Sequence, residues 1–130
     1  MRTGGWPAVV ALTMLLAGCA PAETEQVRDA AVDFQTRVAA QDWPAACGLL
    51  SDQARGQVES TTARPCAQAL VPLRLSGGAV GEVQVWGANA SARIPSGTVF
   101  LSRFGDGWRV IGAGCTWRGE DRPYDCSVRG

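Results

Sequence analysis

The sequence predicts an α+β domain in which N-terminal helices pack on a curved antiparallel sheet of four or more strands. Three observations carry this prediction. Apolar residues recur at helical spacing up to about residue 70, a break follows at Ser76-Gly77-Gly78, and a period of two begins after the break. Helices followed by an antiparallel meander are typical of the α+β class, with the helices on one face of the sheet.

The helical part begins with a segment over 24–41. Its apolar residues return every three or four positions and so share one helical face: Val27, Ala30, Ala31, Phe34 and Val38. Asp42 is placed to cap a short helix over about 43–50, and Ser51 to cap another. A further helical turn is expected around Cys66. The prediction is one longer helix followed by several short ones.

The second half of the chain predicts strands, because apolar and polar residues alternate there. The expected strands are 79–86, 88–94, 98–104 and 108–115. Gly105-Asp106-Gly107, between the last two, is a typical hairpin turn. Strands joined by such short turns are antiparallel neighbours. The remaining segment, 117–130, is expected to be a tail that would fray unless a Cys115–Cys126 disulfide held it.

The charged residues exclude several classes of function. All 12 basic residues are arginines, 12 acidic residues balance them, and the chain has no histidine. Without histidine and lysine there is no Ser-His-Asp triad, no imidazole metal ligand and no Schiff-base lysine. A formal net charge of zero argues against a nucleic-acid partner, which requires a basic face. We therefore expect a protein that is not an enzyme and has no cofactor or metal.

The N-terminus has the features of an export signal. Met1-Arg2 is positive, and an apolar run from Ala8 to Ala17 follows. The run is shorter than the ~20 residues that a helix needs to cross a bilayer. It ends in Leu16-Ala17-Gly18-Cys19, which resembles the lipobox of bacterial lipoproteins. That resemblance implies cleavage before Cys19 and lipid on this residue, a diacylglycerol with acyl chains such as palmitate.

This reading divides the chain into three parts. Residues 1–18 are the expected lipoprotein signal peptide, 19–23 a lipid-anchored tether, and 24–130 a single α+β domain with a disulfide-tied C-terminal tail. Two alternatives stay open. One is an ordinary secretory signal cut after Ala17 or Ala20, and the other is a membrane helix that is retained.

Five cysteines fit the same compartment, since lipid on Cys19 leaves four thiols for disulfides. Three pairings are possible, and we favour the local one, Cys47–Cys66 with Cys115–Cys126. Each pair brackets a segment that turns back on itself. A metal site made of four cysteines is the alternative, but the chain has no C-x-x-C spacing.

The order of elements resembles the NTF2-like family, whose cone-shaped domains wrap a bent sheet around a long N-terminal helix. Small exported lipoproteins of high-GC, actinobacterial-type bacteria look similar. They share a turn like Asp42–Cys47, a strand like Gly107–Val110, and cysteines in the contexts Gly114-Cys115 and Tyr124-Asp125-Cys126. The resemblance covers about residues 24–128 and implies a fold more than an activity. A cystatin-like sheet over one helix is the near alternative.

Few residues indicate chemistry. Some NTF2-like proteins are isomerases or cyclases that use a buried carboxylate, for which Asp33 and Glu82 are the candidates, although both lie on polar sides of their elements. Glu120, Asp121 and Asp125 match a calcium loop poorly. Aromatic side chains dominate the walls of ligand pockets. The residues expected to line a pocket in the cone are Phe34, Trp86, Phe100 and Trp108.

The function expected from these observations is a lipid-anchored extracytoplasmic lipoprotein on the outer face of a bacterial cell membrane. It would be a non-catalytic binding or accessory module of the cell envelope. Lipid on Cys19 would attach it to the membrane, and its partner would be another envelope protein or a small apolar ligand. The alternatives are an NTF2-like envelope enzyme of the isomerase or cyclase type and a purely structural spacer.

Overall fold

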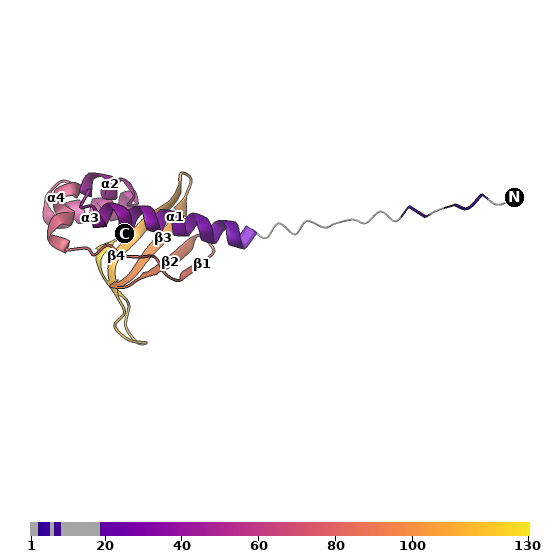
Figure 1. Cartoon of the computed structure of the whole chain (residues 1–130). Helices are drawn as coiled ribbons and strands as arrows, with labels where there is room; N and C mark the ends of the chain where they lie inside the picture. The colour runs from indigo at the N-terminus through magenta and orange to yellow at the C-terminus, as the bar shows by residue number, and fades with distance from the viewer. Residues whose placement is uncertain (1–2, 6, 9–18) are drawn as a thin grey trace.

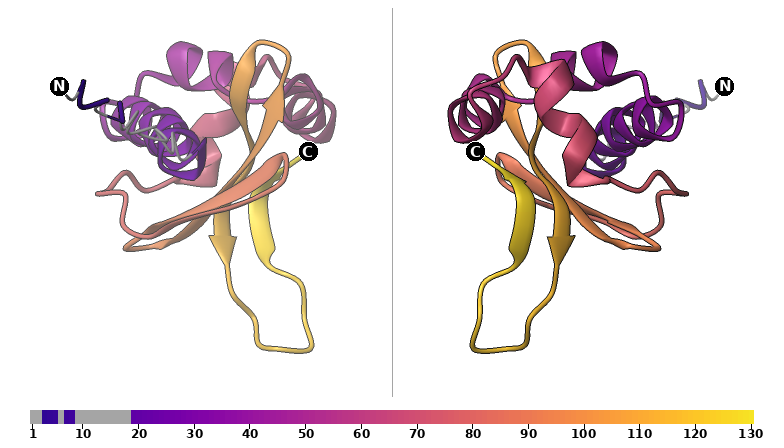
Figure 2. Two further views of the ribbon diagram at one scale, coloured as in Figure 1. Left: turned by 90° about the vertical axis from the view of Figure 1, so that its right-hand side faces the viewer. Right: turned by 90° about the vertical axis from the view of Figure 1, so that its left-hand side faces the viewer.

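The computed structural model describes residues 3–5, 7–8 and 19–130. Its helices cover one face of an antiparallel sheet (Figure 1). The predicted α+β class, with helices on a sheet of four or more strands, is therefore confirmed. Viewed along α1, the helices lie on one side of the sheet and the connection between β4 and β5 extends on the other (Figure 2).

The helical layer consists of one long helix and several short ones. Its elements are α1 (Cys19–Ala39), α2 (Trp43–Gly48), α3 (Asp52–Thr62), α4 (Cys66–Leu70) and a 3-10 turn, η1 (Val71–Leu73). Helix α1 starts earlier than the predicted residue 24, so the backbone of residues 19–23 is helical. Its first turns are attached to the sheet, because the Glu23 carboxylate pairs with the Arg103 guanidinium.

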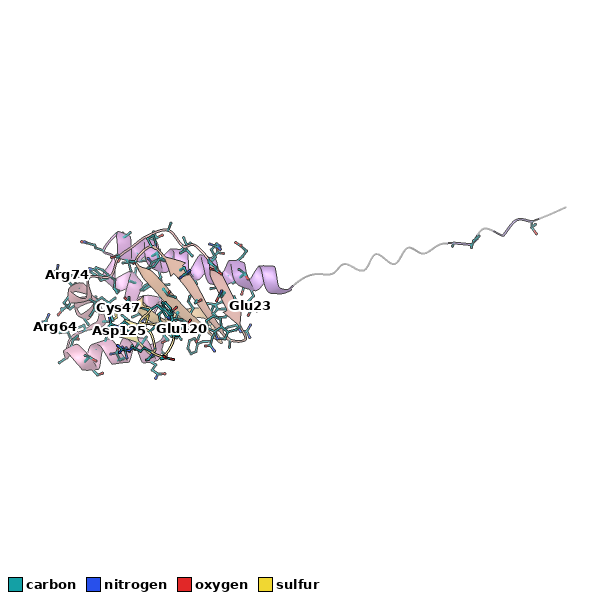
Figure 3. All side chains as sticks on the ribbon, turned by 90° about the horizontal axis from the view of Figure 1, so that it is seen from below. Glu23, Cys47, Arg64, Arg74, Glu120 and Asp125 are labelled. Atoms are coloured by element: carbon teal, nitrogen blue, oxygen red, sulfur yellow. A yellow bond between two sulfur atoms is a disulfide. The ribbon has the colours of Figure 1, made fainter. Side chains whose placement is uncertain are left out.

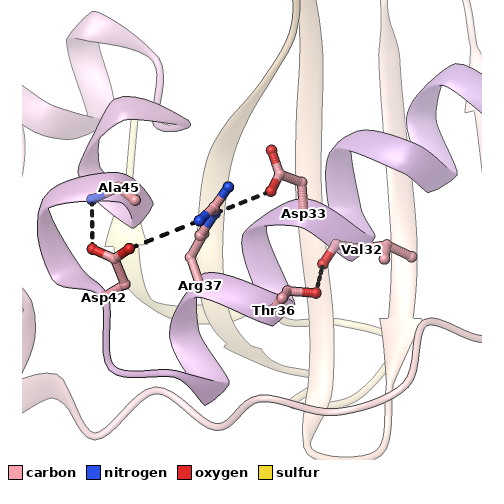
Figure 4. Close-up of polar contacts among 6 residues, drawn as sticks. All are labelled: Val32, Asp33, Thr36, Arg37, Asp42 and Ala45. Carbon is pink, nitrogen blue, oxygen red and sulfur yellow. Dashed lines mark hydrogen bonds and ion pairs between the residues drawn. The ribbon is translucent and has the colours of Figure 1, made fainter.

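Side-chain caps explain where the short helices begin. The Asp42 carboxylate accepts a hydrogen bond from the Ala45 amide at 3.3 Å and lies 3.8 Å from the Arg37 guanidinium (Figure 4). The Ser51 hydroxyl accepts a hydrogen bond from the Ala54 amide at 3.1 Å. Both predicted caps are thus confirmed, and each satisfies an amide that the first helical turn leaves unpaired.

The sheet of the described residues has five strands in the order β1-β2-β3-β4-β5, with every neighbour antiparallel. The strands are β1 (Val83–Trp86), β2 (Asn89–Ile94), β3 (Gly97–Phe104), β4 (Gly107–Thr116) and β5 (Asp125–Arg129). Four of them correspond to predicted strands. The fifth, β5, lies in the segment expected to be a tail. Register shifts interrupt the β3–β4 ladder on either side of Phe100.

Strand β4 also joins the sheet to the helices. Beyond the end of β5, the edge of β4 pairs with the connection between α2 and α3 in a parallel bridge, Leu50 to Val110. The Ser51 amide donates to the Val110 carbonyl at 2.8 Å, and the Val110 amide donates to the Leu49 carbonyl at 3.0 Å. The helix connection thus continues the sheet where β5 ends.

The core lies between the helices and the sheet. Fully buried residues of α1, among them Val27 and Phe34, pack over those of the strands, such as Ala92, Leu101 and Val110. Alternation along each strand explains this, because every second side chain points to the helices. No helix in residues 19–130 combines the length and the hydropathy of a membrane span.

Two disulfides close the pairs favoured from the sequence. Cys47 in α2 is bonded to Cys66 in α4 across a separation of 19 residues, and Cys115 in β4 to Cys126 in β5 across 11. The first bond joins two short helices that could bury little surface alone. The second joins two strands at direct partner positions.

Candidate binding site on the helix-free face

Alternation gives the sheet a second face that carries no helix in the described part of the chain. Core residues such as Val83, Ala92 and Val99 alternate with side chains that point the other way. The side chains of this helix-free face in β1–β3 include polar groups, Gln84, Ser91, Arg93, Thr98 and Ser102, and the aromatic rings of Trp86 and Phe100. The polar groups can bind polar ligands without exposing the core.

A hollow of about 140 Å³ lies on this face. Its walls come from three strands and from the connection between β4 and β5: Glu82, Gln84, Ser91, Arg93, Thr98 and Tyr124. They supply hydroxyl, amide, carboxylate and guanidinium groups. The hollow therefore offers both hydrogen-bond donors and acceptors.

One acid and one base stand opposite each other in this hollow. The Arg93 amide donates to the Glu82 carbonyl at 2.9 Å, which places the two residues across from each other between β2 and the start of β1. Their side chains form no ion pair with each other among the described contacts. The Glu82 carboxylate instead accepts a hydrogen bond from the side-chain amide of Gln84 at 3.0 Å. The Arg93 guanidinium thus stays available to a ligand.

Tyr124 belongs to the connection between β4 and β5, residues 117–124, which we call the arm. The Tyr124 ring meets the Phe100 ring edge to face, with centroids 4.9 Å apart and planes at 77°. Both side chains are half-buried. Such aromatic contacts are worth about 0.5–1.5 kcal/mol beyond the area they bury. The contact holds the end of the arm against the helix-free face.

A second hollow, of about 240 Å³, lies within the arm. It is lined by Arg118, Arg122, Pro123, Tyr124, Asp125 and Arg129. The Arg129 guanidinium donates to the Asp125 carboxylate at 2.9 Å and to the Cys126 carbonyl at 3.1 Å. Tyr124 therefore lines both the mixed polar hollow and the one that is rich in arginine.

The four aromatic residues predicted to line a pocket do not come together. Phe34 is 1% exposed and fills the core under α1. Trp86 ends the edge strand β1 and is 49% exposed. Phe100 supports Tyr124, and Trp108 is half-buried against the core with the Arg103 guanidinium 5.9 Å from its ring centroid. None of the four lines either hollow described above.

The two carboxylates considered for acid–base chemistry also lie apart. Asp33 is on α1, where its carboxylate accepts from Arg37 at 3.2 Å (Figure 4). Glu82 lines the hollow on the face of the sheet away from α1. The sheet therefore separates them. Across the residues that the structure describes, no three acidic or cysteine side chains are gathered as a metal site, and Asp125 of the acidic segment is paired with Arg129.

One carboxyl group has a perturbed titration. The Arg109 Nε donates to the Asp106 Oδ2 at 3.1 Å, and a second guanidinium nitrogen donates to the same oxygen. This hydrogen bonding, together with the positive charge of Arg109, lowers the pKa of Asp106 below its ordinary value. The pair lies at the turn between β3 and β4, where Arg109 also donates to the Gly48 carbonyl. It ties the hairpin to α2.

Sequence reasoning missed the residues that gather on the helix-free face, above all Arg93, Arg118, Arg122 and Tyr124. The alternation of β2 does place Arg93 opposite the core residues. The arm gave no such signal, because its side chains reach the sheet only after the disulfide and Tyr124 position them.

Comparison of the chain with family models, curated proteins and solved structures finds no match.

Proposed function

We propose that this chain is a lipid-anchored extracytoplasmic lipoprotein of the bacterial envelope and that its domain is a non-catalytic binding or accessory module. The observation that carries the proposal is the cysteine arrangement. Cys47, Cys66, Cys115 and Cys126 pair with one another, so no cysteine of this chain is left to pair with Cys19. Disulfides persist outside the cytoplasm. The segment before Cys19 resembles a signal for attachment of lipid to this residue.

The start of α1 supports close attachment to the membrane. Because α1 begins at Cys19, acyl chains on this residue would join a helix that is packed on the sheet and paired through Glu23 and Arg103. One acyl chain gives marginal membrane binding, whereas two or three hold a protein durably. The domain would then stand near the bilayer surface. Its long helix across a sheet is also what an NTF2-like or cystatin-like assignment would require.

The helix-free face supports a binding role. Its two hollows are lined by polar and charged groups that can donate and accept hydrogen bonds. We propose that the ligand or envelope partner binds on this face, around Tyr124. A polar ligand fits these walls better than the small apolar ligand expected from the sequence.

Metabolic labelling with an alkyne fatty acid, followed by membrane fractionation, tests the anchor. The full chain should carry the label and sediment with membranes, whereas Cys19→Ser should lose the label and leave the membrane fraction or remain unprocessed. The double variant Cys115→Ser/Cys126→Ser is the control, since it also replaces cysteine by serine but should keep the label. Unchanged labelling of Cys19→Ser would reject the proposal.

A further inference from the structure

We infer that the arm is an anion site and that Arg118 and Arg122 are the principal donors to a phosphate group bound there. The inference rests on the proposed binding role and names the chemistry of its ligand. It concerns the second hollow, whose walls are Arg118, Arg122, Pro123, Tyr124, Asp125 and Arg129.

The first argument is the balance of charge in this hollow. Three guanidinium groups and one carboxylate line it. The carboxylate, Asp125, is already paired with Arg129 at 2.9 Å. Two positive charges therefore share the site without an acid from the hollow to neutralise them. Like charges held close together repel, and a bound anion relieves this repulsion.

The second argument is that nearby acids do not occupy these arginines. Glu120 and Asp121 are close neighbours of Arg122 in the chain, yet among the described residues neither forms an ion pair with Arg118 or Arg122. The ion pairs found among the described residues involve four other arginines: Arg37, Arg103, Arg109 and Arg129. The guanidinium donors of the arm are thus free for a ligand.

The third argument is that the arm is held in shape before any ligand binds. The Cys115–Cys126 disulfide closes its base, and the Tyr124 ring rests on Phe100. At the tip, the Arg122 amide donates to the Gly119 carbonyl at 3.2 Å. A loop fixed in this way loses less conformational entropy on binding, which leaves more of the contact energy as affinity.

Phosphate is the anion that these donors fit best. The planar guanidinium group donates two parallel hydrogen bonds to the oxygens of phosphate or carboxylate. A phosphate monoester carries about −1.5 to −2 charges at pH 7, which matches the two arginines that lack an acid. A single carboxylate would neutralise only half of that charge. The hydroxyl of Tyr124, which lines both hollows, can add one more donor.

Residue-resolved NMR titration of the full chain in a neutral detergent tests the inference. The probe is inorganic phosphate, added against sodium chloride at constant ionic strength. We expect saturable shifts of the Arg118 and Arg122 Nε–H signals. Either Arg118→Gln or Arg122→Gln should weaken phosphate binding about tenfold, since a hydrogen bond to a charged group contributes about 1.5 kcal/mol or more.

Arg64→Gln is the matched control, because Arg64 is also exposed but lies by α3 and α4, well apart from Glu120 of the arm (Figure 3). It should leave phosphate binding unchanged. Absence of saturable shifts, or equal affinity in the arm variants and the parent chain, would overturn the inference. The measurement does not depend on lipid at Cys19, so failure of the anchor and failure of the anion site are distinguishable.

The source of the phosphate is decided by two further probes, both phosphate monoesters: glycerol 3-phosphate and short-chain phosphatidic acid used as a monomer. Binding of both through the same arginines supports a phosphate site that accepts a lipid headgroup. Binding of glycerol 3-phosphate alone supports a soluble phosphate monoester. Binding of neither, or binding that survives loss of both arginines, counts against the site.

Discussion

Cys115 and Cys126 are direct partners across β4 and β5, and their bond closes the base of the arm. The position matters because the arm between them contacts the rest of the domain chiefly through Tyr124 and Phe100. The disulfide therefore keeps an otherwise exposed excursion of the chain in register with the sheet. The arginines of the arm, Arg118 and Arg122, line one hollow together with Tyr124.

Replacing both Cys115 and Cys126 by serine should lower the free energy of unfolding by about 2–3 kcal/mol, as expected for a short disulfide loop. Urea denaturation measures this loss. Amide hydrogen exchange should quicken first in the arm and in β5. Ser127→Ala, at an exposed position in the same strand, is the control and should change neither quantity. If amide exchange in the arm stayed slow in the variant without the disulfide, contacts other than the disulfide would be sufficient to hold the arm in place.

Gly97→Ala should destabilise the domain by about 2–3 kcal/mol. Residue 97 has φ of 153°, and an added Cβ would lie 2.2 Å from the Cys115 carbonyl oxygen in the neighbouring strand. Gly105→Ala is the matched control, because no atom lies within 4 Å of its Cβ position. Thermal unfolding should separate the two variants clearly; equal midpoints would contradict the close packing of β3 on β4.

Ser51→Ala should cost about 1 kcal/mol of stability, because it removes the hydroxyl that caps α3. The Ser51 side chain is 4% exposed, so water cannot replace the lost hydrogen bond to the Ala54 amide. Ser60→Ala, at an exposed position of the same helix, should have almost no effect. Chemical denaturation of the three proteins checks this, and a silent Ser51→Ala would argue against the cap.

Arg109→Gln should raise the pKa of the Asp106 carboxyl toward its ordinary value, as measured by NMR titration. The folded-state pKa of this group is lowered, so the pair stabilises the fold above the unfolded-state pKa of Asp106. That contribution disappears as the pH falls through the lower, folded-state pKa. Arg103→Gln alters the same hairpin but not this pair, and the Asp106 titration should not move in it.

The helices and the central strands were predictable because local patterns specify them. Asp42 and Ser51 mark helix starts by their own chemistry, and the alternation around Val99 and Leu101 assigns the core face of β3. The start of α1 was not predictable from apolar spacing. Its first residues are held through the pairing of Glu23 with Arg103, 80 positions apart in the sequence.

The candidate site was largely unpredictable, for a reason that β5 illustrates. Only Val128 of β5 is buried, so the strand has too short an apolar pattern to detect. It forms because Cys126 is bonded to Cys115 and because Val128 pairs with Ala113. Phe100 meets the helix-free face because it alternates with Val99 and Leu101 along β3. Its contact with Tyr124 was not predictable, because Tyr124 belongs to a connection with no repeating pattern.

The backbone bridge between Val110 and the α2–α3 connection has a consequence for how the molecule comes apart. Both backbone polar groups of Val110 in β4, its N–H and its C=O, bond to the connection between two helices, so we expect the helices and the strands to unfold together. Far-ultraviolet and near-ultraviolet dichroism should lose their signals at the same temperature, with calorimetric and van't Hoff enthalpies in agreement.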